Sequence, residues 1–273
     1  MDVRITPSRL SGSVTPPPSK SQAHRLLLCA ALAQGVSTIS HVVLSQDIRA
    51  TLQCMKALGA SWVREGSSLR ITGIGGRARL ERLPRMDCGE SGSTLRFLIP
   101  VALATAGGGV FTGQGRLMDR PQGPYFDLFR AKGITFFREG NTLTVQGQLT
   151  PGEYRLPGNV SSQFFTGLLF ALPLLSGKST IVSTTAVESR DYINMTLDAL
   201  ASARVTVEEL ATPTTAFSVS PGIYRPLEQA VEADWSQAGF WYAADFLDSR
   251  VDIRGLNPDS AQGDKAVSEL YWR

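Results

Sequence analysis

The stretch "SKSQAHRLLLCAALAQGVSTISHVV", from Ser19 to Val43, decides how this chain is organised. A Ser-Lys-Ser opening leads into an apolar run, Gly35 ends that run, and a segment rich in β-branched residues follows. Serine is favoured before the first turn of a helix and glycine after the last one, whereas β-branched residues favour strands. The stretch therefore predicts a helix, a stop and a strand.

The same order of elements recurs along the chain. It returns in "SGSTLRFLIPVALATAGGGVFTG" from Ser91, in "SSQFFTGLLFALPLLSGKSTIVST" from Ser161 and in "DWSQAGFWYAADFLDSRVDIRG" from Asp234. The copies are about 70 residues apart, and similarity at a fixed period indicates a repeat architecture. After each of the first three copies come a second amphipathic helix and two strands, with Glu-Gly hairpin turns in units one and two. One unit therefore reads βαβαββ.

The repeats predict the domain organisation. We expect an α/β fold with a pseudo-symmetric domain of three complete repeats at residues 19–230. Residues 1–18 and 231–273 are expected to form an incomplete second domain, in which "DVRITP" (residues 2–7) adds a strand to the fourth unit. That unit has its first helix, its strand and a second helix near Gln262, but no closing hairpin. The sequence thus predicts a truncated chain, with the rest of the second domain in a longer protein.

Composition limits the classes of function. The chain has 273 residues, 42% of them hydrophobic and 19% charged, which is typical of a soluble globular protein. A net charge of +3 without a basic run argues against nucleic-acid binding. No apolar run could span a bilayer, and the lack of an apolar signal core predicts a cytoplasmic protein. Cys29, Cys54 and Cys88 share no metal-ligand spacing, and neither phosphate-binding Gly-rich motif occurs. Two histidines give little support to a metal site or a Ser-His-Asp triad.

Polar clusters stand where the helices begin. First helices open with Lys20, Ser21, Arg25, with Glu90, Ser91, Gly92, Ser93, Arg96 and with Ser161, Ser162, Gln163; second helices open near Arg116, Arg120 and near Ser189, Arg190, Tyr192. A helix start attracts anions because its N–H groups are unpaired and its dipole is positive there. Serines at these positions are also ordinary helix caps. Recurrence at one position in three units favours a shared site for a polyanion, such as a phosphate with carboxylates.

These motifs carry a family resemblance. "SKSQAHR", "SGSTLR", "GRLMDRP", "VSSQF" and "SRDYI" together resemble the EPSP synthase family of enolpyruvyl transferases, in the right order over almost the whole chain. The resemblance implies two domains of three βαβαββ units joined by a hinge. It also implies transfer of the enolpyruvyl group from phosphoenolpyruvate to the 5-hydroxyl of shikimate 3-phosphate, in the shikimate pathway of aromatic amino acid biosynthesis. No metal or organic cofactor, nucleic acid or membrane is implied, and a monomer is expected.

The resemblance also implies roles for single residues. Lys20 would be catalytic and would lie between the two substrates. Shikimate 3-phosphate would be bound by Lys20, Ser21, Arg25, Ser161, Ser162, Gln163, Ser189 and Tyr192. Phosphoenolpyruvate would be bound by Lys20, Gly92, Arg96, Arg116 and Gln163. The family often has Asn at the position of Glu90 and Thr at that of Ser93. Its acid–base carboxylates lie in the second domain and have no counterpart in this sequence.

Three alternatives remain at this stage. A UDP-N-acetylglucosamine enolpyruvyl transferase typically opens with a Lys-Asn pair, where this chain has Lys20-Ser21. RNA 3′-phosphate cyclase-like proteins share similar repeats but need a nucleotide and a histidine nucleophile that the sequence does not place. The third alternative comes from a different class, a fragment that binds shikimate 3-phosphate without doing chemistry.

Overall fold

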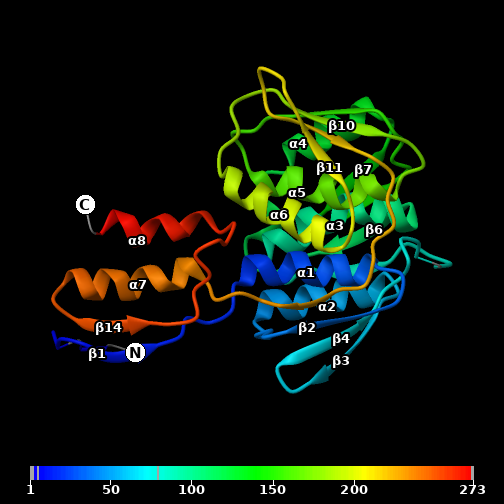
Figure 1. Ribbon diagram of the computed structural model, residues 1–273. Coiled ribbons are helices and arrows are strands. Elements are labelled where there is room, and N and C mark those ends of the chain that lie inside the picture. Colours follow the sequence, from blue (N-terminus) through cyan, green and yellow to red (C-terminus); the bar gives the residue numbers. More distant parts are fainter. Residues whose placement is uncertain (1–2, 5, 79, 272–273) are drawn as a thin grey trace.

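A computed structural model describes residues 3–4, 6–78 and 80–271 (Figure 1). Residues 19–230, called the body below, contain three four-stranded sheets of one topology. Sheet one has the strand order β13 (Glu228–Ala230), β2 (Val36–Ser40), β4 (Ser68–Thr72), β3 (Ser61–Glu65). Sheet two has the order β5 (Arg85–Asp87), β6 (Gly108–Thr112), β8 (Thr142–Gln146), β7 (Thr135–Glu139). Sheet three has the order β9 (Glu153–Leu156), β10 (Ser179–Ser183), β12 (Ala216–Val219), β11 (Val207–Leu210). In each sheet the first pair is parallel and the other two are antiparallel, which confirms the predicted repeat.

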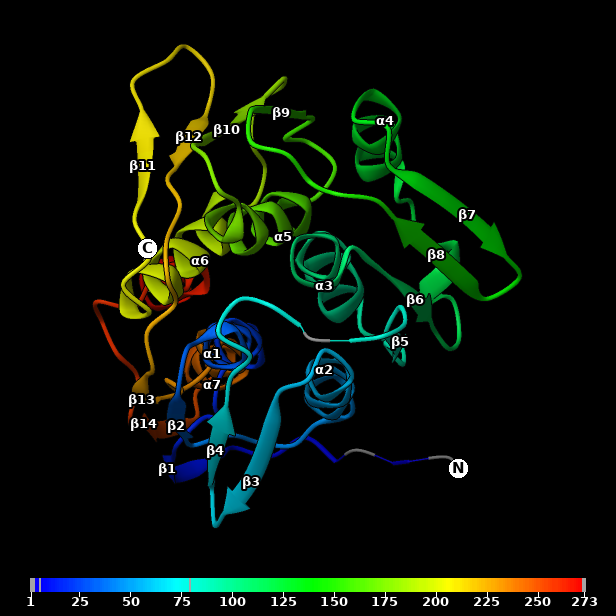
Figure 2. The ribbon, with the colours of Figure 1, turned by 90° about the vertical axis from the view of Figure 1, so that its right-hand side faces the viewer.

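Two helices belong to each unit. The first helices are α1 (Lys20–Leu32), α3 (Gly92–Ala106) and α5 (Ser162–Ala171), the last extended by the 3₁₀ turn η2 (Leu172–Leu174). The second helices are α2 (Gln46–Ala57), α4 (Gly123–Ala131) and α6 (Arg190–Ser202), and the 3₁₀ turn η1 (Leu117–Asp119) precedes α4. Figure 2 shows α1, α3 and α5 near the middle of the body with the sheets around them. The starts of these helices carry the polar clusters that the sequence singled out.

Unit one takes its first strand from the far end of the body. β5 and β9 directly precede the first helices of units two and three, but the equivalent strand of unit one is β13, which pairs in parallel with β2. The Leu227 N–H also donates to Ser37 Oγ (3.0 Å) beside this pairing. The chain therefore closes the body by returning to its first sheet, a contact that no local sequence pattern predicts.

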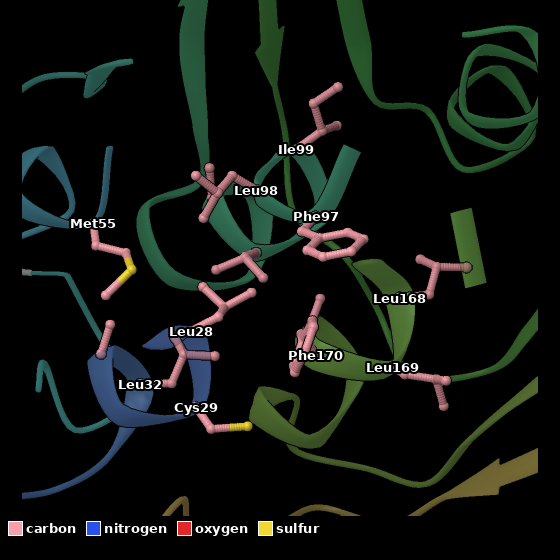
Figure 3. Packing of buried hydrophobic residues seen from close by; sticks show 14 of the residues in the cluster. Leu28, Cys29, Leu32, Met55, Phe97, Leu98, Ile99, Leu168, Leu169 and Phe170 are labelled. Atoms are coloured by element: carbon pink, nitrogen blue, oxygen red, sulfur yellow. The ribbon is translucent and has the colours of Figure 1, made fainter. Parts of the chain in front are cut away.

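The core lies between the first helices. Ten consecutive residues of α1, from Ala23 to Leu32, are buried, as expected of a helix surrounded by others. Figure 3 shows Phe97 of α3 facing Phe170 of α5, and their ring centroids are 5.8 Å apart. Gly167 allows the close approach of these helices, because a Cβ there would lie 2.9 Å from Pro100 Cγ and would also meet Tyr125. Close packing of this kind makes the body sensitive to changes of single methyl groups.

The fourth unit lies beside the body. It contains β1 (Ser11–Val14), α7 (Trp235–Phe246), β14 (Arg250–Ile253), the 3₁₀ turn η3 (Gly263–Ala266) and α8 (Val267–Leu270). β1 pairs in parallel with β14 (Figure 1), so an N-terminal strand does join this unit. The strand is at residues 11–14 rather than in "DVRITP": residues 3, 4, 6 and 7 are outside strands, and residues 2 and 5 lie outside the described part. The partner strand, not the β propensity of the segment, sets the position. Within the described part, no helix combines the length and apolarity needed to cross a membrane.

Candidate active site

A cavity of about 400 Å³ lies where the body meets the fourth unit. The starts of α1 and α6 form its body side and the starts of α7 and η3 form the opposite side. It is lined by Ser19, Lys20, Ser21, Ser189, Asp191, Tyr192, Met195, Asp234, Ser236, Gln262, Gly263 and Asp264. Four of the predicted site residues, Lys20, Ser21, Ser189 and Tyr192, therefore share one cavity.

Lys20 is the cationic residue among those that line this cavity. It is the first residue of α1, and Ser19 caps the helix by accepting a hydrogen bond from the Gln22 N–H (3.4 Å). Lys20 Nζ lies 2.8 Å from Asp47 Oδ2 of α2, and the Lys20 side chain is 55% exposed. An ion pair with that exposure is weak, so Lys20 is held in place but remains available to a ligand.

The fourth-unit side of the cavity carries carboxylates that the sequence reasoning missed. Asp234 caps α7 by accepting from the Ser236 N–H (2.9 Å) and the Gln237 N–H (3.3 Å). Burial, with Asp234 and Asp191 nearby, raises the pKa of the Asp264 carboxyl. Burial also raises the pKa of Tyr192, reinforced by Asp264 and opposed by Arg25. Asp191 at the start of α6 adds a carboxylate on the body side, so the favourable contacts to an anion are those of Lys20, Ser21 and Ser189.

Arg25 lies beneath the cavity and not on its surface. It is 2% exposed, and its Nη1 donates to Ser21 O (2.7 Å) while its Nη2 donates to Tyr192 O (2.8 Å). Its Nε donates to Thr196 Oγ1 (2.9 Å), and burial lowers its pKa to about 10. Arg25 thus ties the two helix starts that present Ser21 and Tyr192, while direct contact with a ligand stays a prediction.

A second cluster joins the starts of α3 and α5. Arg96 Nη1 donates to Gln163 Oε1 (2.9 Å), and Gln163 Nε2 donates to Ser93 Oγ (3.0 Å). A Cβ on Gly92 would lie 2.8 Å from Arg120 Nη1, so the small residue allows this guanidinium to approach. Arg96 lies over the Phe164 ring at 4.7 Å, and burial lowers its pKa. Gly92, Arg96 and Gln163 therefore lie close together, while their contact with a ligand stays a prediction.

The remaining predicted residues flank this second cluster. Ser161 caps α5 by accepting from the Gln163 N–H (3.3 Å), and Ser162 is buried in the first turn. Arg116 is exposed and lines a separate hollow with Asp119, Arg120 and Pro121. Since Arg120 also approaches Gly92, the hollow adjoins the cluster. Glu90 is exposed and lies against Gly115, so its carboxylate stays beside the start of α3.

The sequence reasoning missed Asp234, Asp47 and Asp264, and they differ in how clearly the sequence marks them. Asp234 is the helix cap of the fourth unit, in the place where the first unit has Ser19, and the repeat pattern could have indicated it. Asp47 is in the first turn of α2, two residues after the cap Ser45. Asp264 reaches the cavity through the path of the chain between β14 and η3, and no local pattern marks it.

Comparison with known proteins fits this geometry. A sequence model of EPSP synthase (3-phosphoshikimate 1-carboxyvinyltransferase) matches residues 5–271. The chain belongs to the EPSP synthase family. Two relatives named 3-phosphoshikimate 1-carboxyvinyltransferase are similar over almost the whole chain. The one from Clostridium beijerinckii is 41% identical over 280 residues, and the one from Clostridium botulinum is 42% identical over 276.

The comparisons also set the extent of the match. The alignments cover 100% and 99% of this chain but 64% and 63% of those EPSP synthase family members. A solved structure of EPSP synthase from Acinetobacter baumannii is similar in fold, with a TM-score of 0.74 at 23% identity. That match covers 92% of this chain and 57% of the other. The chain therefore spans less than two thirds of the length of these family members.

Proposed function

We propose that this chain is the shikimate 3-phosphate-binding part of a 3-phosphoshikimate 1-carboxyvinyltransferase. The reaction transfers the enolpyruvyl group of phosphoenolpyruvate to shikimate 3-phosphate and releases phosphate. One observation carries the proposal: Lys20 and Ser21 line the same cavity as Ser189 and Tyr192, although the two pairs are in different units. The names of the Clostridium relatives support it.

The proposal divides the site between the two ligands. Shikimate 3-phosphate is assigned to Lys20, Ser21, Arg25, Ser161, Ser162, Gln163, Ser189 and Tyr192. Phosphoenolpyruvate is assigned to Lys20, Gly92, Arg96, Arg116 and Gln163. Arginine can bind a carboxylate or phosphate in bidentate fashion, and lysine acts as a compact charge. Gln163 would contact both ligands, because it is hydrogen-bonded to Arg96 and also follows Ser161 and Ser162.

In this mechanism Lys20 would neutralise charge between the two ligands. Addition requires a proton at the methylene carbon of phosphoenolpyruvate and removal of one from the attacking hydroxyl, and elimination reverses these transfers. The resemblance assigns the acid–base carboxylates to a part of the family's second domain that this chain does not span. The body would therefore contribute positioning and charge, which are large terms in a reaction without covalent activation.

The domain division is part of the proposal. Residues 19–230 would be the complete domain and platform for shikimate 3-phosphate, and residues 1–18 with 231–273 would belong to the second domain. We also propose a monomer in the cytoplasm. Its three cysteines are free thiols, as is usual in a reducing compartment, and light scattering would measure the mass in solution.

A binding module without catalysis is the second candidate. The coverage of 64% of a family member favours it, because the resemblance assigns the acid–base carboxylates to the part of the family member that the alignment does not cover. Turnover by the chain alone, compared with turnover after addition of the remaining part of the Clostridium beijerinckii relative, separates the two candidates. Turnover that needs the added part would indicate the platform of an enzyme.

Calorimetry with shikimate 3-phosphate, phosphoenolpyruvate and UDP-N-acetylglucosamine tests the ligand. We expect shikimate 3-phosphate to bind most tightly, because its assigned contacts are on helix starts that the chain contains. Ser189→Ala should weaken that binding, whereas Ser202→Ala, at the far end of the same helix α6, should not. Tighter binding of UDP-N-acetylglucosamine, or equal effects of the two serine changes, would contradict the proposal.

A further inference from the structure

His24 is part of the "SKSQAHR" motif but has no role in the function proposed above. It is 2% exposed, and its Nδ1 lies 2.8 Å from Thr51 Oγ1 of α2. Thr51 Oγ1 lies 2.7 Å from Thr94 Oγ1 of α3, and the Thr94 hydroxyl is 2.7 Å from Ser91 Oγ. All four residues are buried. They form one continuous hydrogen-bonded chain across α1, α2 and α3.

The hydrogen bond between His24 and Thr51 lies one helix turn deeper than an ion pair between the same two helices. Lys20, which lines the cavity, pairs with Asp47 of α2 at 2.8 Å. His24 and Thr51 are each four residues further along the same two helices, so they lie on the same faces. The exposed ion pair and the buried hydrogen bond are therefore two successive rungs that fix α1 against α2.

The hydrogen-bonded chain ends at Ser91, beside the cluster at the starts of α3 and α5. Ser91 is the N-cap of α3, and its Oγ also accepts from the Thr94 N–H (3.2 Å). The next residue is Gly92, which is approached by Arg120. The hydrogen-bonded chain thus connects the helix turn below Lys20 with the helix start that holds Gly92.

The hydrogen bonds determine which ring nitrogen of His24 carries the proton. When the Thr94 hydroxyl donates to Ser91, it must accept from Thr51, and Thr51 must then accept from a protonated Nδ1 of His24. Nε2 is then an unprotonated acceptor, and it is buried with no partner in the described part of the chain. An unpartnered acceptor is tolerated more often than an unpartnered N–H. Burial lowers the pKa of His24 to about 3, which agrees with a neutral ring.

We propose that His24, Thr51 and Thr94 are positioning residues that fix where Lys20 lies relative to Gly92 by preventing the helices α1, α2 and α3 from sliding along one another. Apolar contacts between helices allow small sliding movements, whereas a buried polar chain is satisfied in one register only. The proposal rests on the proposed function for the identity of the two ligands. The positioning of the helix starts can be tested without any ligand.

Thr94→Val is the main test, because it keeps nearly the same side-chain volume and removes the hydroxyl that links Thr51 to Ser91. Thr94→Ser restores the hydroxyl and is the rescue variant. Thr105→Val is the matched control: Thr105 is also buried in α3, but its hydroxyl donates within the helix to Val101 O (2.8 Å). Amide hydrogen exchange of the hydrogen-bonded amides in the N-terminal halves of α1, α3 and α5 is measured in all three variants.

We expect Thr94→Val to speed exchange of the hydrogen-bonded amides in the N-terminal halves of α1 and α3 by about tenfold or more, with the N-terminal half of α5 within about twofold of the original protein. Thr94→Ser should behave like the original protein. A Thr94→Val pattern that matches Thr105→Val, or a uniform increase that includes α5, would overturn the proposal.

Nuclear magnetic resonance of the original protein gives a second test that does not depend on the folding of a variant. We expect the His24 ring to show a single neutral tautomer from pH 5 to pH 8. A ring that titrates in this range, or that interconverts between tautomers, would overturn the proposal.

Ligand binding gives a third readout. Thr94→Val should weaken phosphoenolpyruvate binding in the presence of shikimate 3-phosphate by about fivefold or more, and shikimate 3-phosphate binding by less than about twofold. Equal losses for both ligands would overturn the positioning role. If the original protein binds neither ligand, the proposed function fails, while hydrogen exchange and the tautomer still decide the positioning role.

Discussion

α1 and α7 occupy the same place in their units, yet ten residues of α1 are buried and only Trp235 and Ala238 of α7 are. The sequences are not the reason, because α7 is at least as apolar as α1. α1 packs against α2, β2 and β4 of its own unit and against α6 of unit three, whereas α7 contacts mainly β14, η3 and α8. Phe240 of α7 is 70% exposed, while Leu28 of α1 is 1% exposed. Burial of a first helix is therefore a property of the assembled units and not of the single repeat.

The largest test of this comparison is a pair of truncations. Leu28→Ala should lower the free energy of unfolding by about 3 kcal/mol, because it leaves a cavity in a packed core. Phe240→Ala should change it by less than about 0.5 kcal/mol, because the ring is already in water. Urea denaturation of both variants measures this. Similar losses would mean that α7 is packed in solution in a way that the structure does not show.

The pH dependence of stability should come from α1. Burial lowers the pKa of His24 from 6.5 to about 3, with Arg25 and Lys20 reinforcing the shift and Asp47 opposing it. The unfolded chain therefore binds a proton below pH 6.5 that the folded chain refuses down to about pH 3, so stability is lost as the pH falls through this window. From pH 7 to pH 5 the loss is about 2 kcal/mol.

Two histidine variants check the source of that dependence. His24→Asn should remove the difference in unfolding free energy between pH 7 and pH 5. His41→Asn is the control, since His41 is exposed and has a left-handed backbone (φ 57°) that asparagine tolerates. If His41→Asn removes the pH dependence, the assignment to His24 is wrong.

Helix caps should distinguish the body from the fourth unit. Ser19 caps α1 and Asp234 caps α7, and loss of such a cap costs about 1 kcal/mol. Ser19→Ala should lower the stability of the whole body. Asp234→Ala should increase hydrogen exchange in α7 while the amides of α3 and α5 keep their protection. Equal protection losses throughout the chain would show that the body and the fourth unit unfold together.

Much of the fold was predictable from the sequence because each unit carries its own local signals. Caps such as Ser91, stops such as Gly107 and β-branched strands define the elements before any tertiary contact is known. The position of β1 and the closing strand β13 were not predictable, because each is defined by a partner strand far away in sequence.

The candidate site was predictable to a similar degree. Repeats and motifs together indicated Lys20, Ser21, Ser189 and Tyr192, and one cavity contains all four. The burial of Arg25 could not be predicted, since it depends on acceptors on α6 such as Thr196 Oγ1. Asp191 lines the cavity from the first turn of α6, next to Tyr192, and was within the quoted motif, whereas the position of Asp264 depends on how the fourth unit lies against the body.

A change at Lys20 should have the smallest effect on the chain alone, and it tests directly how α1 and α7 lie on opposite sides of the cavity. Its side chain is 55% exposed and pairs with Asp47 at 2.8 Å, at the edge of a cavity whose other side begins at α7. A solvated cation contributes little to binding, whereas the same charge in a water-poor site contributes much more. We therefore expect Lys20→Ala to weaken shikimate 3-phosphate binding by this chain by less than about 1 kcal/mol. After addition of the remaining part of the Clostridium beijerinckii relative, the same change should abolish most turnover. Calorimetry on the chain and a phosphate-release assay on the mixture measure the two effects. A large loss of affinity in the chain alone would place Lys20 in the shikimate 3-phosphate platform and not between the two domains.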